Sequence, residues 1–295
     1  MKRTPSNGAP AVLSIDVEDW FQVENLKVVI DRESWGRQSL RVETNVDRLL
    51  DLLATSGGGV RSTWFVLGWV AERCPDVVRR IADAGHEIAS HGYDHDLLDR
   101  LSPDAFRDDV ERSKRLLEEI TGSAVRGYRA PSFSITDWAL PILRGLGFQY
   151  DSSLFRTVAH DRYGRLPGMP PQAVAEVLPG FFEVAISSMT VASASIPWGG
   201  GGYFRLLPYP LFRAGARKIQ RSGDPYVFYI HPWEIDPDQP RPGGLPRISR
   251  FRHYVGLGRC EGRLERLVAD FEWVTMGELV DRFRPAAGNG SEGGN

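Results

Sequence analysis

Two histidines four residues apart, His91 and His95 in the stretch ASHGYDHDLL, are the first candidates for chemistry. On a helix, this spacing would place both imidazoles on one face, as in a metal-binding helix. Gly92 is a poor helix residue, however, and the preceding DAGHEIAS is typical of a turn that enters a short buried strand. We therefore expect the pair in a loop after a strand, where parallel α/β folds keep their chemistry. Two solvated loop histidines are the alternative interpretation.

Other reactive side chains also follow predicted strands. SIDVEDW places Asp16, Glu18 and Asp19 at the end of the first strand. GYRAP places Arg129 after a later strand, and YIHPW places His231 after one near the end of the chain. Because the carboxyl ends of parallel barrel strands point to one face, we expect these groups to share one pocket with the histidine pair. A surface ion pair for the arginine and a hydrogen-bonded core position for the last histidine are the alternatives.

The elements that must position these groups alternate between short apolar strands and amphipathic helices. Expected strands cover 11–17, 60–66, 86–91, 125–131 and 148–153, and expected helices cover 45–57, 74–85, 102–122 and 136–147. Pro75 at a helix start and Ser102 as an N-cap support two of these helices. Alternation at this spacing predicts an α/β fold with a parallel sheet or a (β/α) barrel.

After about residue 154 the pattern becomes less regular. Segments 165–172 and 195–210 are rich in Gly, Pro and aromatic residues, and we expect them to be loops folded over the scaffold. A strongly apolar strand over 226–230, a helix over 260–271 and a last strand and helix over 272–283 complete the alternation. We expect one domain over 11–285, with a flexible N-terminus over 1–10 and a disordered tail over 286–295.

The composition excludes several classes of protein. With 42% hydrophobic and 25% charged residues and a net charge of −2, the 295-residue chain has the composition of a globular protein. This charge argues against nucleic acid as the main partner. The two cysteines, Cys74 and Cys260, form no metal or redox spacing and are expected to be buried or incidental thiols in a reducing compartment. Without an export signal or an apolar run of membrane-spanning length, we expect a cytoplasmic protein.

The ordered motifs resemble those of a known enzyme family. An acidic strand end, H-x-x-x-H, R-x-P and a late strand that ends in His look like the polysaccharide deacetylases of the NodB-homology type, carbohydrate esterase family 4. The resemblance covers roughly residues 12–283 and implies a single-domain, distorted (β/α) barrel with irregular C-terminal insertions, which removes acetyl groups from sugars with one divalent metal. DVEDWF, RAPSFSI and HYVGLG resemble the branch associated with exosortase (PEP-CTERM) loci, for which 150–283 is a family-specific region.

The resemblance also implies a role for each candidate. Asp16 would be the general base, Arg129 its partner and His231 the general acid, while His91 and His95 would bind the metal. Two histidines and one carboxylate leave positions open for water and substrate, as a catalytic zinc site requires. Many relatives have two adjacent aspartates where this chain has DVED, so either Glu18 or Asp19 would supply the third ligand. We expect Zn²⁺, with Co²⁺ or Ni²⁺ as alternatives.

The expected substrate is an N-acetylhexosamine unit in a bacterial exopolysaccharide or its lipid-linked precursor, with peripheral association with the assembly machinery. Candidates for substrate contact are Trp20, Pro131, Asp151, Trp198, Tyr203 and Trp233. Asp151 is also a candidate for orienting His231, and core packing is the alternative for the aromatic residues. The segment 199–204, GGGGYF, could approach a sugar closely or form a flexible loop. A metal-independent hydrolase of cyclic amides and a catalytically silent carbohydrate-binding protein are the rival functions.

Overall fold

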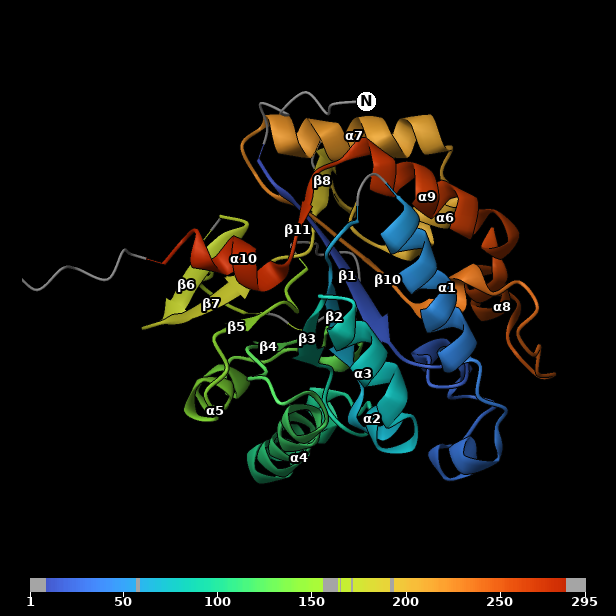
Figure 1. Ribbon diagram of the computed structural model, residues 1–295, viewed down its shortest axis with the longest axis horizontal. Helices are drawn as coiled ribbons and strands as arrows, with labels where there is room; N and C mark the ends of the chain where they lie inside the picture. Colours follow the sequence, from blue (N-terminus) through green and yellow to red (C-terminus); the bar gives the residue numbers. More distant parts are fainter. Residues whose placement is uncertain are drawn as a thin grey trace, which may run out of the picture.

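The fold is organised around one curled, mostly parallel β-sheet (Figure 1). The computed structural model describes residues 9–56, 59–155, 164, 166–170, 172–191 and 194–284. Within this part of the chain, nine strands join the main sheet and two form a separate hairpin. The strands are β1 (Ala11–Val17), β2 (Thr63–Val66), β3 (Glu87–Ser90), β4 (Gly127–Tyr128), β5 (Tyr150–Asp151), β6 (Val174–Leu178), β7 (Phe181–Val184), β8 (Ser188–Val191), β9 (Ala194–Pro197), β10 (Tyr226–Ile230) and β11 (Trp273–Val274).

The strand order explains why the candidate residues can meet. The main sheet has the order β10-β1-β2-β3-β4-β5-β7-β6, and β11 pairs with the start of β1. Every pairing from β10 to β7 is parallel, and only β6 and β7 are antiparallel. All seven residues of β1 are buried, as expected for a strand covered on both faces. The carboxyl ends of β10, β1, β2, β3 and β4 therefore lie at one edge of the sheet.

Helices cover the outside of the curled sheet, and α1 to α5 follow one another in an arc around it (Figure 1). Their starts obey local rules, since Pro75 opens α3 and the Ser102 side chain accepts a hydrogen bond from the Ala105 backbone N–H at the start of α4. The helices are α1 (Val42–Thr55), α2 (Gly68–Arg73), α3 (Pro75–Asp83), α4 (Pro103–Thr121), α5 (Ala139–Gly145), α6 (Gly201–Leu206), α7 (Tyr209–Arg221), α8 (Arg247–Tyr254), α9 (Cys260–Asp270) and α10 (Met276–Asp281).

The barrel is distorted because irregular backbone, rather than a regular strand pair, joins β10 to the region after β7. The Ser187 N–H donates to the Val227 carbonyl at 3.3 Å, and the Tyr229 N–H donates to the Gly199 carbonyl at 2.7 Å. A Cβ atom at Gly199 would clash with the Val227 carbonyl, so only glycine allows this approach. The prediction of an α/β fold with a distorted barrel is confirmed.

The second half of the chain is more regular than its composition predicts. Segment 195–210 was expected to be loop, but it contains β9 and α6, and α7 and α8 were not anticipated. Gly201 lies against the Glu234 carboxylate and Gly215 against the Trp198 ring, with no room for a Cβ at either position. The glycines of this region therefore allow close packing, which a count of glycines cannot distinguish from flexibility.

One hydrophobic core includes residues from both halves of the chain, from Ala11 to Phe271. Cys74 and Cys260 are both free thiols and buried, as predicted. None of the helices in the described ranges combines the length and the apolar character needed to cross a bilayer. The predictions of a flexible N-terminus and a disordered tail concern residues that lie outside the described part of the chain, apart from Ala9 and Pro10.

Candidate active site

The candidate residues converge on one pocket at the carboxyl ends of the strands. Asp16 lies in β1, and Glu18 follows that strand directly. His91 follows β3, and His231 follows β10. These four residues and His95 line a cavity of about 580 Å³. The expectation of one shared pocket is therefore met for these five residues, whereas Arg129 and Asp19, which were also expected there, do not line it.

Three of the pocket residues form a cluster that could hold a metal ion. Ligand atoms of Glu18, His91 and His95 all lie within 4.8 Å of one another, and all three side chains are buried. His91 Nδ1 lies 2.8 Å from the Arg129 carbonyl, an interaction that leaves Nε2 as the nitrogen facing the cluster. Glu18 Oε2 lies 3.4 Å from His95 Nε2 and has no hydrogen-bond donor although it is buried. A divalent cation would satisfy this buried carboxylate oxygen, so the residues fit the group.

The protonation states also suit metal binding. Burial lowers the pKa of His91, and it lowers the pKa of His95 to about 4. Both rings are therefore neutral near neutral pH, which is the form in which an imidazole nitrogen coordinates a metal. Burial alone would raise the pKa of Glu18, but His95 and His231 lower it to about 2. The cluster thus offers two neutral nitrogens and one carboxylate.

An unusual loop conformation brings the two histidines together. Gly92 has φ +73° and His95 has φ +56°, so the chain folds back between them instead of continuing as a helix. Asp109 of α4 accepts hydrogen bonds from the backbone N–H groups of Tyr93 at 2.8 Å and Asp94 at 3.1 Å. Asp109 therefore holds the loop, although nothing in the sequence spacing linked it to the histidines.

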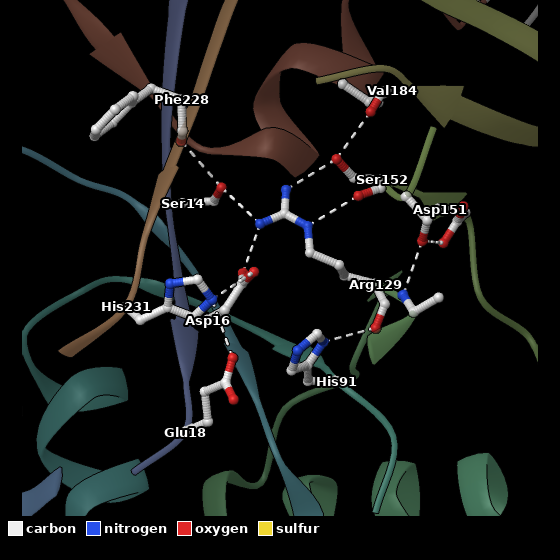
Figure 2. Close-up of polar contacts among 12 residues, drawn as sticks. Ser14, Asp16, Glu18, His91, Arg129, Asp151, Ser152, Val184, Phe228 and His231 are labelled. Atoms are coloured by element: carbon white, nitrogen blue, oxygen red, sulfur yellow. Dashed lines mark hydrogen bonds and ion pairs between the residues drawn. The ribbon is translucent and has the colours of Figure 1, made fainter. Parts of the chain in front are cut away.

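Asp16 and Arg129 form a buried ion pair beneath the pocket (Figure 2). Arg129 Nη1 donates to Asp16 Oδ1 at 2.6 Å and to Ser14 Oγ at 2.9 Å. Its other nitrogens donate to the Ser152 carbonyl at 2.8 Å and the Ser152 hydroxyl at 3.0 Å. Its guanidinium also lies 4.0 Å from the centre of the Phe65 ring. Both partners are almost fully buried, which rules out the alternative of a surface ion pair.

His231 lies among three carboxylates. Its Nε2 atom lies 3.0 Å from Glu18 Oε1 and 3.9 Å from Asp16 Oδ2. Its Nδ1 atom lies 2.8 Å from Glu234 Oε1, and Arg205 Nε in turn lies 2.6 Å from Glu234 Oε2. Burial alone would lower the pKa of His231, but Glu18 and Glu234 raise it to about 10. These neighbouring carboxylates therefore favour the protonated form of His231, which lines the pocket.

Matches to known families cover two consecutive parts of the chain. Residues 35–150 match the family described as Polysaccharide deacetylase. The chain carries a domain of the polysaccharide deacetylase family. Residues 152–281 match a domain of unknown function, DUF3473. His91 and His95 lie in the first matched segment and His231 lies in the second, so both segments contribute to the pocket. Asp16 and Glu18 precede both segments.

Curated relatives of this deacetylase domain share about a third of their length with the chain. A peptidoglycan deacetylase-like protein, FGM2, from Gibberella zeae is 38% identical over 109 residues, which are 37% of this chain and 32% of that protein. The peptidoglycan deacetylase of Helicobacter pylori is 33% identical over 112 residues, which are 38% of each chain.

The fold of the chain is also found in a solved structure. A crystal structure from Mycobacterium smegmatis, assigned to the polysaccharide deacetylases, aligns with a TM-score of 0.62 and 24% identity. The alignment covers 95% of this chain and 92% of that one. The likeness therefore extends through the C-terminal region as well as the segment matched to the deacetylase family.

Asp19 is the sequence-predicted ligand that the structure places outside the metal cluster. Its carboxylate accepts hydrogen bonds from the backbone N–H groups of Trp20 at 2.8 Å, Arg41 at 2.8 Å and Val42 at 3.0 Å. The last two open helix α1, so Asp19 satisfies N–H groups that the helix leaves unpaired. Burial raises the pKa of Asp19 to about 6 despite these bonds. Of the two acids left open by the sequence, Glu18 is the one that faces the histidines.

Asp151 does not orient His231, so that expectation is wrong. Its carboxylate accepts a hydrogen bond from Ser153 Oγ at 2.7 Å and lies buried beside Glu183, behind Arg129 (Figure 2). Burial raises the pKa values of both carboxyl groups in this pair. Glu234 is the carboxylate that contacts the His231 ring instead. A signal for it exists in HPWE, because an acid three residues after an N-cap position commonly bonds back to it.

The predicted aromatic rim is only partly present. Trp233 and Tyr203 line the pocket, and Trp233 stacks between His231 and His253 at ring distances of 5.2 and 4.4 Å. Trp198 and Trp20 are instead buried in the core, where their indole N–H groups donate to backbone carbonyls. Core packing, the alternative interpretation, is therefore correct for these two tryptophans.

Pro131 is buried next to the pocket without lining it. The following residues, Ser132 and Phe133, line the pocket and have φ values of +50° and +60°. Sequence reasoning also missed Arg205 and Tyr229 as lining residues. Tyr229 belongs to the YIHPW motif but was not singled out there, whereas Arg205 belongs to no recognisable motif and reaches the pocket only in the folded chain.

Proposed function

We propose that this protein is a metal-dependent hydrolase that removes N-acetyl groups from N-acetylhexosamine units of a glycan. The observation that carries the proposal is the convergence, in one pocket, of the Glu18–His91–His95 cluster with Asp16 and His231. Amide hydrolysis needs a polarised carbonyl, an activated water, and a proton for the departing amine. The pocket supplies a candidate for each requirement.

Asp16 is the proposed general base. Its Oδ1 atom is bound by Arg129, while Oδ2 points towards His231 across the floor of the pocket. The paired guanidinium fixes the orientation of the carboxylate, which suits a group that accepts the proton of the attacking water. Ser14 and Ser152 hold Arg129 in turn, so the arginine that orients the base is itself fixed in position.

His231 is the proposed general acid. Glu234 binds Nδ1 and so leaves Nε2 facing the pocket, where it lies 3.0 Å from Glu18 Oε1. From this position the Nε2 proton can be donated to the nitrogen of the leaving amine. Glu234 is in turn fixed by the buried Arg205. In this arrangement the Glu234 carboxylate orients the His231 imidazole, as a buried carboxylate orients the histidine of a catalytic triad.

Glu18, His91 and His95 would hold the metal. When bound, a divalent ion supplies Lewis acidity, which polarises the acetyl carbonyl and lowers the pKa of water at the site. Two histidines and one carboxylate favour Zn²⁺, with Co²⁺ or Ni²⁺ as alternatives.

The finer identity of the substrate is part of the proposal. Four similar proteins are named for peptidoglycan, and others are named for chitooligosaccharide and chitin, which also carry N-acetylated sugars. The sequence resemblance to the exosortase-associated branch favours an exopolysaccharide or its lipid-linked precursor as the target. A cytoplasmic location and contact with exopolysaccharide assembly machinery rest on the sequence argument alone.

The test combines metal analysis with acetate release. The purified protein is stripped with a chelator, restored with Zn²⁺, Co²⁺ or Ni²⁺, and incubated with a panel of N-acetylated oligosaccharides. We expect acetate release that depends on metal, and we expect His91→Ala to lose both metal and activity. His86→Ala is the matched control, because His86 lies at the opposite end of β3 and should leave the metal content unchanged.

Two outcomes would reject the proposal. Opening of a cyclic amide such as allantoin, without acetate release from any glycan, would favour the metal-independent rival. Glycan binding with no hydrolysis under any metal would favour a catalytically silent binding protein.

A further inference from the structure

Helix α8 forms one side of the pocket mouth and exposes apolar side chains there. Arg247, Ile248, Phe251, Arg252 and Val255 all line the cavity, and their spacing places them on one face of the helix and its C-terminal cap. On a helical projection, the apolar residues form a stripe with an arginine at each edge. Helix α8 lies at the outer edge of the molecule, on the right in Figure 1. We call this surface the α8 lip.

The apolar residues of the α8 lip are unusually exposed. Ile248 is 68% exposed and Phe251 is 56% exposed. Leu206, at the end of α6, lines the same pocket and is 48% exposed. Single exposed apolar residues need no explanation, but three around the mouth of one pocket mark a surface with a binding role.

The charge around the α8 lip is strongly positive. Between Asp238 and Glu261 the sequence contains five arginines and no acidic residue, although the whole chain has a net charge of −2. These are Arg241, Arg247, Arg250, Arg252 and Arg259, and all five are exposed. In the described part of the chain, none of them lies within ion-pair distance of a carboxylate. Most arginines elsewhere on the surface, such as Arg112 with Glu72, do have such a partner.

We propose that the α8 lip docks on the surface of a lipid bilayer that contains anionic lipids. Exposed Ile, Phe and Leu side chains flanked by arginines are the composition of an interfacial surface, with the apolar groups entering the headgroup region and the cations at phosphate level. A sugar-binding rim would instead present flat aromatic faces or hydrogen-bonding groups.

Docking at this position has a consequence for the substrate. The α8 lip borders the pocket that contains Asp16 and His231, so a docked molecule would place its pocket mouth at the membrane surface. The acetylated sugar would then be one carried by a lipid in the membrane. This consequence rests on the proposed function, whereas the docking itself does not.

Vesicle flotation tests the docking without any measurement of activity. The full chain is floated with phosphatidylcholine vesicles and with vesicles of phosphatidylcholine and phosphatidylglycerol in equal amounts, at low and high salt. We expect binding to the anionic vesicles that weakens with salt. Arg247→Gln and Arg250→Gln should each weaken binding about fivefold, and Ile248→Ser with Phe251→Ser should weaken it about tenfold.

Matched variants elsewhere on the surface are the controls. Phe283→Ser removes an exposed aromatic residue near the C-terminal helix, where the side chain is 49% exposed. Arg107→Gln removes an exposed arginine on α4, on a different part of the molecule. Both should bind anionic vesicles as the unmodified protein does.

Three results would overturn the docking proposal. The first is no binding of the unmodified protein to anionic vesicles at low salt, and the second is equal binding by the α8 variants. The third is a dimer in solution that the Ile248→Ser, Phe251→Ser variant converts to monomer, which would show an interface between copies of the chain.

The docking and the proposed function can fail separately. Asp16→Asn should float with anionic vesicles as the unmodified protein does, although it lacks the proposed base. Acetate release from a soluble oligosaccharide without vesicle binding would leave the proposed function in place and reject docking. Vesicle binding without acetate release from any glycan would leave the docking in place and reject the proposed function.

Discussion

Separate replacement of Glu18 and of Asp19 should distinguish the acid that binds the metal from the acid that stabilises the fold. The two acids are adjacent in sequence, but only Glu18 faces the histidine pair. We expect Glu18→Gln to lose the metal, with a larger effect than the 10–100-fold loss of affinity typical of an outer-shell partner. We expect Asp19→Asn to keep the metal and to lower the free energy of unfolding.

The size of the Asp19 effect follows from its hydrogen bonds. One carboxylate oxygen accepts from the Trp20 N–H, and the other accepts from the N–H groups of Arg41 and Val42. An asparagine has only one acceptor oxygen, so one or two of these backbone donors lose their partner. At about 1–3 kcal/mol for each unsatisfied donor, the loss is about 1–6 kcal/mol. Because burial raises the pKa of Asp19 to about 6, the cost comes from lost acceptors more than from lost charge.

The assay measures metal content by mass spectrometry after dialysis and stability by urea unfolding. Unfolding is followed in chelator, because bound metal would itself stabilise the folded state and mix the two effects. A lower midpoint at an unchanged slope reports a true loss of stability. Loss of metal in Asp19→Asn together with full occupancy in Glu18→Gln would refute the assignment.

Two other predictions concern the buried ion pairs. Arg129→Met leaves the Asp16 carboxylate buried without its partner, and the free energy of unfolding should fall by about 3–5 kcal/mol; an unchanged urea midpoint would contradict this. Glu234→Gln removes the partner of Arg205 and loosens His231, so kcat should fall more than KM rises. Burial alone would raise the pKa of Glu234, but Arg205 and His231 lower it from 4.5 to about 2. Its stabilising contribution is therefore present above pH 4.5 and lost as the pH falls towards 2, so the midpoints of the variant and the unmodified protein should converge in acid.

Local patterns determined the scaffold and the identity of the principal site residues. The alternation of apolar strands and amphipathic helices over 11–153 depends on the periods of the two elements and on nearby caps such as Pro75 and Ser102. The histidine pair, Asp16, Arg129 and His231 could be found because each one lies at the end of a strand or shortly after it. In a parallel sheet, position after a strand is enough to assign a residue to one edge.

Long-range packing decided the contacts that support those residues. Asp109 of α4 holds the histidine loop, and Asp19 binds the start of helix α1 instead of facing the histidines. Glu234, by contrast, binds His231 from only three residues away, a contact for which HPWE carries a local signal. The contacts of Asp109 and Asp19 depend on the side of the backbone from which each carboxylate projects. They also depend on which backbone N–H groups, distant in the sequence, are buried away from water and need an acceptor.

Packing against residues distant in the sequence also decides which tryptophans are in the core and why the α8 lip is exposed. Trp198 and Trp233 are equally apolar in the sequence, but one fills the core beneath α7 while the other stacks on His231 at the pocket. Ile248 and Phe251 would be assigned to a core by hydropathy, yet the fold leaves them exposed between arginines. Whether an apolar side chain is buried depends on the surface that faces it, and that surface is formed by residues far away in the chain.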